Sequence, residues 1–300
     1  MAFSASDAAL EGFHLARREP KAILGWSLVQ LVFAIAVNAA SLPFMRPLMA
    51  LQAQQASGSL APAQMMKAAE PLFGVLGALI PIELVVASVL SAAVYRAVLR
   101  PEENGLARLR LGGDELRMGI LFIELGFLFW IVACAVMLLF LFVAAAIGAA
   151  QKADAVNMLG MVALGYVVVM AVMVWLGVRF SLAGPMTFAT RRVHIFSAWR
   201  LTRGRGWQLF GCYLLTAIFL MIILLLQLSV AAVLVLAISG GHAMGGAMQP
   251  DFSSLQAFFS PARIVELLAN AIAGGLYWAV AVAPAAVIYR ELGGPLTPER

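Results

Sequence analysis

The sequence predicts an all-α fold, a polytopic membrane bundle of six transmembrane helices. Of its 300 residues, 63% are hydrophobic and 12% are charged, which is about half the charged fraction of an ordinary soluble domain. A hydrocarbon layer about 30 Å thick requires roughly 20 apolar residues per helix, and six stretches of the chain reach this length. They lie at 22–43, 72–98, 118–149, 157–184, 207–238 and 264–288.

The basic residues between these stretches predict the orientation of the chain. All but four of the 20 lysines and arginines fall in alternate segments: the two ends, the region around 96–117 and the region around 179–205; the four are Arg46, Lys67, Lys152 and Arg263. Because cytoplasmic loops carry the excess of basic residues, we expect both termini in the cytoplasm. Positions 57 and 245 should then be accessible from outside, and positions 104 and 194 from inside.

The segment before the first stretch predicts an amphipathic helix. Ser4 and Asp7 have the spacing of a helix cap, and Pro20 marks the point where the chain turns. One face is polar and the opposite face is apolar: Ser4, Asp7, Glu11, His14 and Arg18 against Ala9, Leu10, Phe13 and Ala16. We expect this helix to lie along the cytoplasmic headgroups. Its acidic residues argue against a cleaved signal peptide, so the first span is expected to be retained.

Three similar segments predict an internal repeat. Half-polar stretches precede the first, third and fifth spans and align without gaps at offsets of 94 and 186, so that Leu15, Leu109 and Leu201 correspond. The second, fourth and sixth spans each end in an arginine: Arg96, Arg179 and Arg290. We interpret the chain as one transmembrane domain, 1–300, built from three units of an interfacial helix and two spans. The units are approximately 1–100, 101–190 and 191–300.

Two carboxylates lie inside predicted spans, Glu83 in the second and Glu124 in the third. An ionisable group in a span is costly and usually has a partner or lines a pathway. The repeat alignment sets Glu124 opposite Gln30 and Thr216, which predicts a polar layer and a buried Glu124. Two interpretations stay open, a structural carboxylate that is neutralised by protonation or by an arginine, and a proton or substrate relay.

The sixth span carries small residues at intervals of four, namely Ala271, Gly275, Ala279 and Ala283. Such a stripe allows helix backbones to approach closely within a membrane. It predicts a packing face and is uninformative about a substrate.

No catalytic or cofactor-binding motif is present. The histidines, His14, His194 and His242, lie in separate segments, and the two cysteines lie in different spans. A soft copper site at His242 and the outer-loop methionines is conceivable on ligand type, but scattered methionine is typical of adaptable packing. We therefore expect no enzyme activity, no metal, no cofactor and no disulfide.

The segment 191–205 contains five arginines and no acid, whereas the corresponding 102–117 contains three arginines beside four acids. Basic residues beside a span are what orientation requires, and no soluble basic fold is present that would bind nucleic acid. The excess favours a further role. Arginine binds phosphate with two parallel donors, and the Gly204-Arg205-Gly206 break begins the fifth span, where helix N–H groups favour anions. We expect Arg200, Arg203 and Arg205 to bind an anionic lipid headgroup or phosphate.

The segments "SASDAALEGFHLARREPKAILGW", "VRFSLAGPMTFA" and "SAWRLTRGRGWQLFGCYLL" resemble a bacterial integral-membrane family, the membrane domain of glycerophosphoryl diester phosphodiesterases. The resemblance implies a multi-span helical bundle of the bacterial inner membrane with no established activity of its own. The hydrolase of the bifunctional relatives is a separate barrel that opens with His-Arg-Gly, a tripeptide that this sequence lacks.

These observations favour a non-enzymatic inner-membrane protein that binds membrane lipid or a protein partner and handles phospholipid or its headgroup products. The alternative is a small transporter in which Glu83, Glu124 and the arginines Arg96, Arg179 and Arg290 line a path. Transporters commonly show paired broken helices, and the sequence offers only Pro81 and Pro284 as breaks.

Overall fold

The computed structural model describes residues 4–55, 62–103, 105–151, 155–238 and 258–293. Over these ranges every regular element is a helix. In chain order they are α1 (Ala5–Arg18), α2 (Pro20–Gln55), α3 (Pro62–Leu99), the 3₁₀ helix η1 (Leu106–Arg108), α4 (Gly113–Gln151), α5 (Ala155–Phe180), α6 (Ala183–Thr190), α7 (Phe196–Leu201), α8 (Gly206–Ile238) and α10 (Pro261–Glu291).

Six stretches are long and apolar enough to cross a membrane, and they confirm the predicted fold class. They are Pro20–Met45, Ala69–Leu99, Leu106–Ile147, Gly160–Thr190, Gly206–Ile238 and Pro261–Glu291. The helices extend beyond the apolar stretches that predicted them. Helix α4 has 39 residues, about 58 Å at 1.5 Å per residue, so it exceeds a hydrocarbon layer of about 30 Å and must tilt or project from it.

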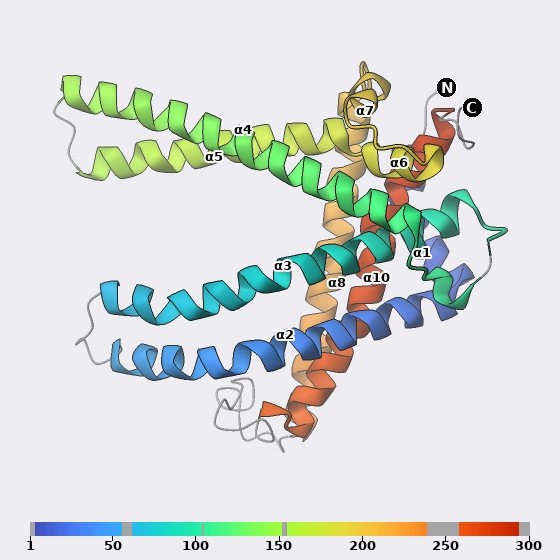
Figure 1. The fold of residues 1–300 in the computed structure, drawn as a ribbon, viewed down its shortest axis with the longest axis horizontal. Coiled ribbons are helices and arrows are strands. Elements are labelled where there is room, and N and C mark those ends of the chain that lie inside the picture. The colour runs from blue at the N-terminus through green and yellow to red at the C-terminus, as the bar shows by residue number, and fades with distance from the viewer. Residues whose placement is uncertain (1–3, 56–61, 104, 152–154, 239–257, 294–300) are drawn as a thin grey trace.

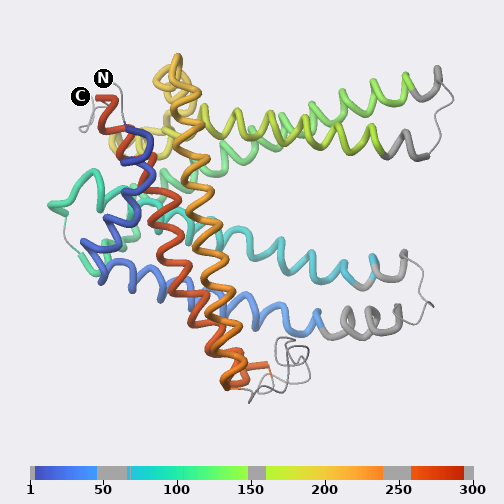
Figure 2. The backbone as a smooth tube through the Cα atoms, turned by 180° about the vertical axis from the view of Figure 1, so that it is seen from behind, coloured from blue at the N-terminus to red at the C-terminus, as the bar shows by residue number. Residues whose placement is uncertain are grey.

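Consecutive spans pair as three antiparallel hairpins, α2 with α3, α4 with α5, and α8 with α10 (Figure 1). The first two hairpins extend to the same side of the α8–α10 pair, which runs across α2 at a steep angle (Figure 2). Helix α1 packs against α10, and the start of α1 lies near the end of α10 (Figure 1).

Helix α10 is the central element and packs against α1, α2, α3 and α8. The predicted stripe of small residues is confirmed as its packing face, because Ala271, Gly275, Ala279 and Ala283 are all buried. A Cβ on Gly275 would lie 2.3 Å from Ser27 Oγ and 2.8 Å from the Ile23 carbonyl oxygen. Helix α2 therefore meets α10 at a distance that only glycine permits.

Helix α1 has the predicted cap and the predicted exposed polar face. Ser4 Oγ accepts a hydrogen bond from the Asp7 N–H at 3.3 Å. The buried residues of α1 are Ala8, Ala9, Gly12 and Leu15, and the helix packs against α8 and α10. The sequence predicted a helix that lies along the headgroups, whereas this helix also packs against the spans. A Cβ on Gly12 would lie 2.4 Å from Val280 Cα. Protein therefore covers a face beside the predicted apolar one, with only Ala9 common to both; Leu10, Phe13 and Ala16 are half-buried.

The three aligned half-polar stretches adopt different local structures. The first forms the 14-residue α1, the second contains only the three-residue η1, and the third contains the six-residue α7. Left-handed backbone accompanies the two short helices, at Ala107 and Arg108 near η1 and at Gly204 after α7. The pairing of consecutive spans fits a threefold repeat, which stays a prediction.

Candidate functional site

A buried arginine organises the end of α3. Arg96 lies in the last turn of that helix with 1% of its side chain exposed. One terminal nitrogen donates to Glu115 Oε1 at 2.6 Å and the other to the Arg108 carbonyl at 2.6 Å. Its Nε lies 3.5 Å from Glu103 Oε2. Arg96 thus holds the α3–α4 connection against the first turn of α4.

A second buried arginine ties this connection to the start of the chain. Arg108 Nε donates to Glu19 Oε2 at 2.6 Å, and a terminal nitrogen donates to the other Glu19 oxygen, which is the two-point geometry that arginine favours with carboxylates. The indole N–H of Trp26, itself fully buried, donates to the Ala107 carbonyl at 2.9 Å. Together these bonds fix the left-handed residues Ala107 and Arg108.

Around Arg96 the described residues carry more positive than negative charge. Asp114 pairs with Arg117 at 2.9 Å, with Arg100 at 3.4 Å and with Arg191 at 4.0 Å. Glu103 lies 3.2 Å from Arg110 and 3.5 Å from both Arg96 and Arg100. Five arginines therefore share three carboxylates, counting Glu115. We call this group the α3–α4 arginine cluster: Arg96, Arg100, Arg110, Arg117 and Arg191 with Glu103, Asp114 and Glu115.

The arginines that end the even-numbered spans bind backbone carbonyls at different places. Arg96 reaches the Arg108 carbonyl, Arg179 donates to the Thr202 carbonyl at 3.1 Å, and Arg290 donates to the Val98 carbonyl at 3.3 Å. Arg179 also lies over the rings of Trp175 and Trp199. These contacts lie at the C-terminal ends of α3, α5 and α10, and they do not assemble the three guanidinium groups around one path.

The predicted anion-binding residues lie at the end of α7, which contains Arg200, and on the turn that leads to α8, which contains Arg203 and Arg205. Arg200 and Arg203 are exposed and Arg205 is half-buried. Within the described structure none of the three side chains forms an ion pair or a hydrogen bond. A hydrogen bond ties the turn to the end of α5, because the buried Thr202 hydroxyl donates to the Arg179 carbonyl at 3.1 Å. Gly204 in the turn has a positive φ of 79°.

Large aromatic side chains flank the same turn. Phe196 at the start of α7 is 71% exposed and Trp207 at the start of α8 is 86% exposed. Aromatic rings beside basic residues are typical of the boundary between headgroups and acyl chains. We call Phe196, Arg200, Arg203, Arg205 and Trp207 the α7–α8 turn surface.

The prediction that Glu124 is buried among helices is wrong, because its side chain is exposed, as is that of Glu83. Helices α3 and α4 meet at Ser88 and Gly119, where a Cβ on Gly119 would lie 3.3 Å from Ser88 Oγ. Both carboxylates lie farther out along the hairpins, beyond this contact. Neither lines any of the cavities described below.

The predicted polar layer is not assembled within the described residues. Thr216 is buried, but its hydroxyl donates within α8 to the Cys212 carbonyl at 2.9 Å. The polar contacts that do join spans were missed: Gln227 Nε2 donates to Asn270 Oδ1, and Arg263 donates to Asn38 Oδ1 at 3.0 Å. The sequence contained a signal for these contacts, because Asn38, Gln227 and Asn270 are single amide side chains within apolar stretches.

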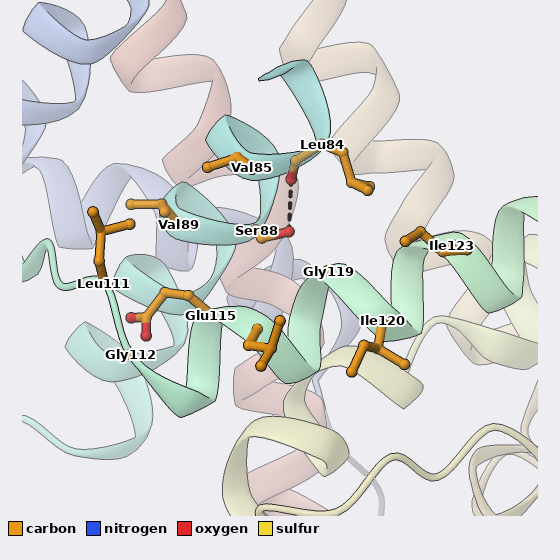
Figure 3. Close-up of a pocket in the computed structure, with 11 residues that line it drawn as sticks. Leu84, Val85, Ser88, Val89, Leu111, Gly112, Glu115, Gly119, Ile120 and Ile123 are labelled. Atoms are coloured by element: carbon orange, nitrogen blue, oxygen red, sulfur yellow. Dashed lines mark hydrogen bonds between the residues drawn. The ribbon is translucent and has the colours of Figure 1, made fainter. Parts of the chain in front are cut away.

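Two cavities adjoin near the α3–α4 contact. The first, about 320 Å³, lies between apolar side chains of the two helices; Figure 3 shows Leu84, Val85, Ile120 and Ile123 around it, with Glu115 at one end. The second, about 360 Å³, is lined by four arginines and two carboxylates of the arginine cluster: Arg96, Arg110, Arg117, Arg191, Asp114 and Glu115. The two cavities share Leu111, Gly112 and Glu115.

Over the ranges that the structure describes, no three His, Cys, Asp or Glu side chains gather as metal ligands. His242 and the neighbouring methionines of the copper alternative lie outside those ranges, as do positions 57, 104 and 245.

Comparison of the chain with models of protein families, with curated proteins and with solved structures gave no match. The resemblance to the phosphodiesterase membrane domain therefore rests on the residues quoted above and stays a prediction.

Proposed function

We propose that this chain, a multi-pass membrane protein, acts without catalysis in a bacterial inner membrane and binds anionic phospholipid headgroups at its cytoplasmic face through Arg200, Arg203 and Arg205. The contrast between two groups of arginines carries the proposal. In the α3–α4 cluster each arginine lies within 4.0 Å of a carboxylate. On the α7–α8 turn surface three arginines have no such partner among the described residues.

The chemistry of the turn suits a phosphate group. A guanidinium offers a planar pair of donors that matches phosphate oxygens, and the turn leads into the N-terminus of the 33-residue α8, where the helix dipole is positive. Trp207 and Phe196 place aromatic surface beside the arginines, which suits the acyl chains next to a headgroup. Phospholipid is the ligand that offers both features at once.

Transport receives less support. That alternative places Glu83, Glu124, Arg96, Arg179 and Arg290 along one path. The two carboxylates are exposed, and the arginines donate to separate backbone carbonyls. A protein partner that covers the turn surface would compete with lipid, since both would use the same unpaired arginines.

The experiment measures lipid retained by the full chain after purification in a mild detergent. Arg203→Gln with Arg205→Gln should lower the affinity of the turn surface for anionic phospholipid roughly thirtyfold, because each arginine near an anionic surface contributes about 1 kcal/mol. Less anionic phospholipid should then be recovered per chain. The control is Arg17→Gln with Lys21→Gln, an equal loss of charge at two exposed positions near the end of α1. Equal retention in the two variants would contradict the proposal.

A further inference from the structure

The apolar cavity between α3 and α4 ends at the arginine cluster. Leu84 and Val85 line the cavity from α3, and Ile120 and Ile123 line it from α4 (Figure 3). The Ser88 hydroxyl donates to the Leu84 carbonyl at 2.6 Å. The walls are therefore apolar along the helices. At about 320 Å³ the space reaches the lower end of the range typical of small-molecule sites.

The polar cavity at its end has the opposite character. Its lining includes Arg96, Arg110, Arg117 and Arg191, while Asp114 and Glu115 supply the carboxylates. Glu115 forms the common wall, and its charge is balanced by Arg96 at 2.6 Å, a pair buried from solvent. The Asp114 carboxylate forms ion pairs with three arginines, Arg100, Arg117 and Arg191. Excess positive charge consequently faces the polar cavity.

Arg117 and Arg191 are free enough to reach a ligand. Their side chains are 36% and 52% exposed, and Arg191 lies at the long distance of 4.0 Å from Asp114. A phosphate could therefore replace or join Asp114 as their partner without breaking the buried Arg96–Glu115 pair. An apolar crevice that opens beside such a group accepts a molecule with an acyl chain and an anionic head.

We propose that these adjoining cavities form a binding site for one anionic phospholipid, with an acyl chain between α3 and α4 and the phosphate at Arg117 and Arg191. This site is separate from the α7–α8 turn surface in residues and in lining. Its geometry specifies where the acyl chain lies between two helices as well as a charge for the headgroup, whereas the turn surface offers exposed arginines and aromatic rings without a cavity for the chain.

The test uses the full chain in bilayers and a phosphatidylglycerol whose acyl chain carries a photoreactive diazirine. Cross-linked peptides are mapped by mass spectrometry. Labelling should concentrate on the cavity residues of α3 and α4, and Ile120→Trp, which fills the cavity, should reduce it roughly tenfold. The matched control is Ile131→Trp on the same helix, since Ile120 and Ile131 are 40% and 44% exposed and only Ile120 lines the cavity.

Two further comparisons test which headgroup binds and distinguish this site from the α7–α8 turn surface. Arg117→Gln with Arg191→Gln should reduce cavity labelling by phosphatidylglycerol, while a phosphatidylcholine probe should label the cavity weakly in every variant. Arg203→Gln with Arg205→Gln should leave cavity labelling unchanged, so the failure of one site is distinguishable from the failure of the other. Labelling spread evenly along α4, equal labelling by the two probes, or no effect of Ile120→Trp would each overturn the proposal.

Discussion

Replacing Glu115 with leucine should destabilise the protein strongly, because the change leaves the buried Arg96 guanidinium without its closest carboxylate. Arg96 is 1% exposed and Glu115 is 6% exposed, with 2.6 Å between donor and acceptor. Removing one partner of a buried pair typically costs about 3–5 kcal/mol. Glu103 stays 3.5 Å from Arg96 Nε and compensates in part, so we expect a loss of about 3 kcal/mol.

The assay can use the protein's own cysteines. Cys212 is fully buried in the core and Cys134 is only half-buried, so a Cys134→Ser background leaves a thiol that reacts with a fluorogenic dye on unfolding. A loss of about 3 kcal/mol should lower the unfolding midpoint in detergent by roughly 6–12 °C.

Two comparisons make this result specific to the buried pair. Glu103→Leu, which removes a carboxylate that is 25% exposed, should cost less than about 1 kcal/mol. Arg96→Met combined with Glu115→Leu should recover at least half of the loss, because replacing both members of a buried pair by apolar groups is often nearly neutral. If Glu115→Leu unfolds at the same temperature as Glu103→Leu, the assignment of Arg96 and Glu115 as the structural pair is refuted.

Three further outcomes follow from the packing and the charges. Gly12→Leu should destabilise the protein by about 1–3 kcal/mol, since its Cβ would meet the Val280 backbone, whereas Gly126→Leu, where nothing lies within 4 Å, should not; a thiol-dye melt compares them. Trp26→Phe loses the bond to the Ala107 carbonyl and should cost about 1 kcal/mol by the same melt, and a melt identical to the parent would contradict the role given to that bond. Single cysteines at Ser57 and Gly245 should react with an impermeant maleimide from outside, and those at Asn104 and His194 only after permeabilisation; reversed labelling of either pair would refute the six-span orientation.

The long-range architecture was predictable where it depends on composition and period. Six apolar stretches predict six spans regardless of how the helices pack, and the small-residue stripe of α10 identifies its buried face because only small side chains allow close backbones. The cap at Ser4 and the polar face of α1 follow from local spacing. These features can be predicted without information on which helices are neighbours in the fold.

The candidate site was predictable only in part, because pairing depends on the fold. The acids of 102–117 could be seen in the sequence as a contrast to the arginine-rich segment. Their partners Arg96 and Arg191 lie outside 102–117, however, and Glu19, which follows the last residue of α1, pairs with Arg108. Glu124 was misjudged for a related reason. The free-energy cost of an acid in a span predicts burial only if other helices surround that position. Glu124 lies beyond the contact of α4 with α3 at Gly119, and its side chain is exposed.

Lipid binding at the α7–α8 turn is tested most directly by the affinity of the full chain for phosphatidylglycerol, titrated by native mass spectrometry. The test variant replaces Arg200, Arg203 and Arg205 with glutamine; the control replaces the exposed Arg17, Lys21 and Arg192 with glutamine and removes the same charge. At about 1 kcal/mol per arginine, the test variant should lose binding at the turn surface and retain only the separate α3–α4 site. The control, whose three residues lie outside both sites, should lose less affinity than the test variant. A test variant that binds as many phosphatidylglycerol molecules, as tightly, as the control would contradict lipid binding at the α7–α8 turn.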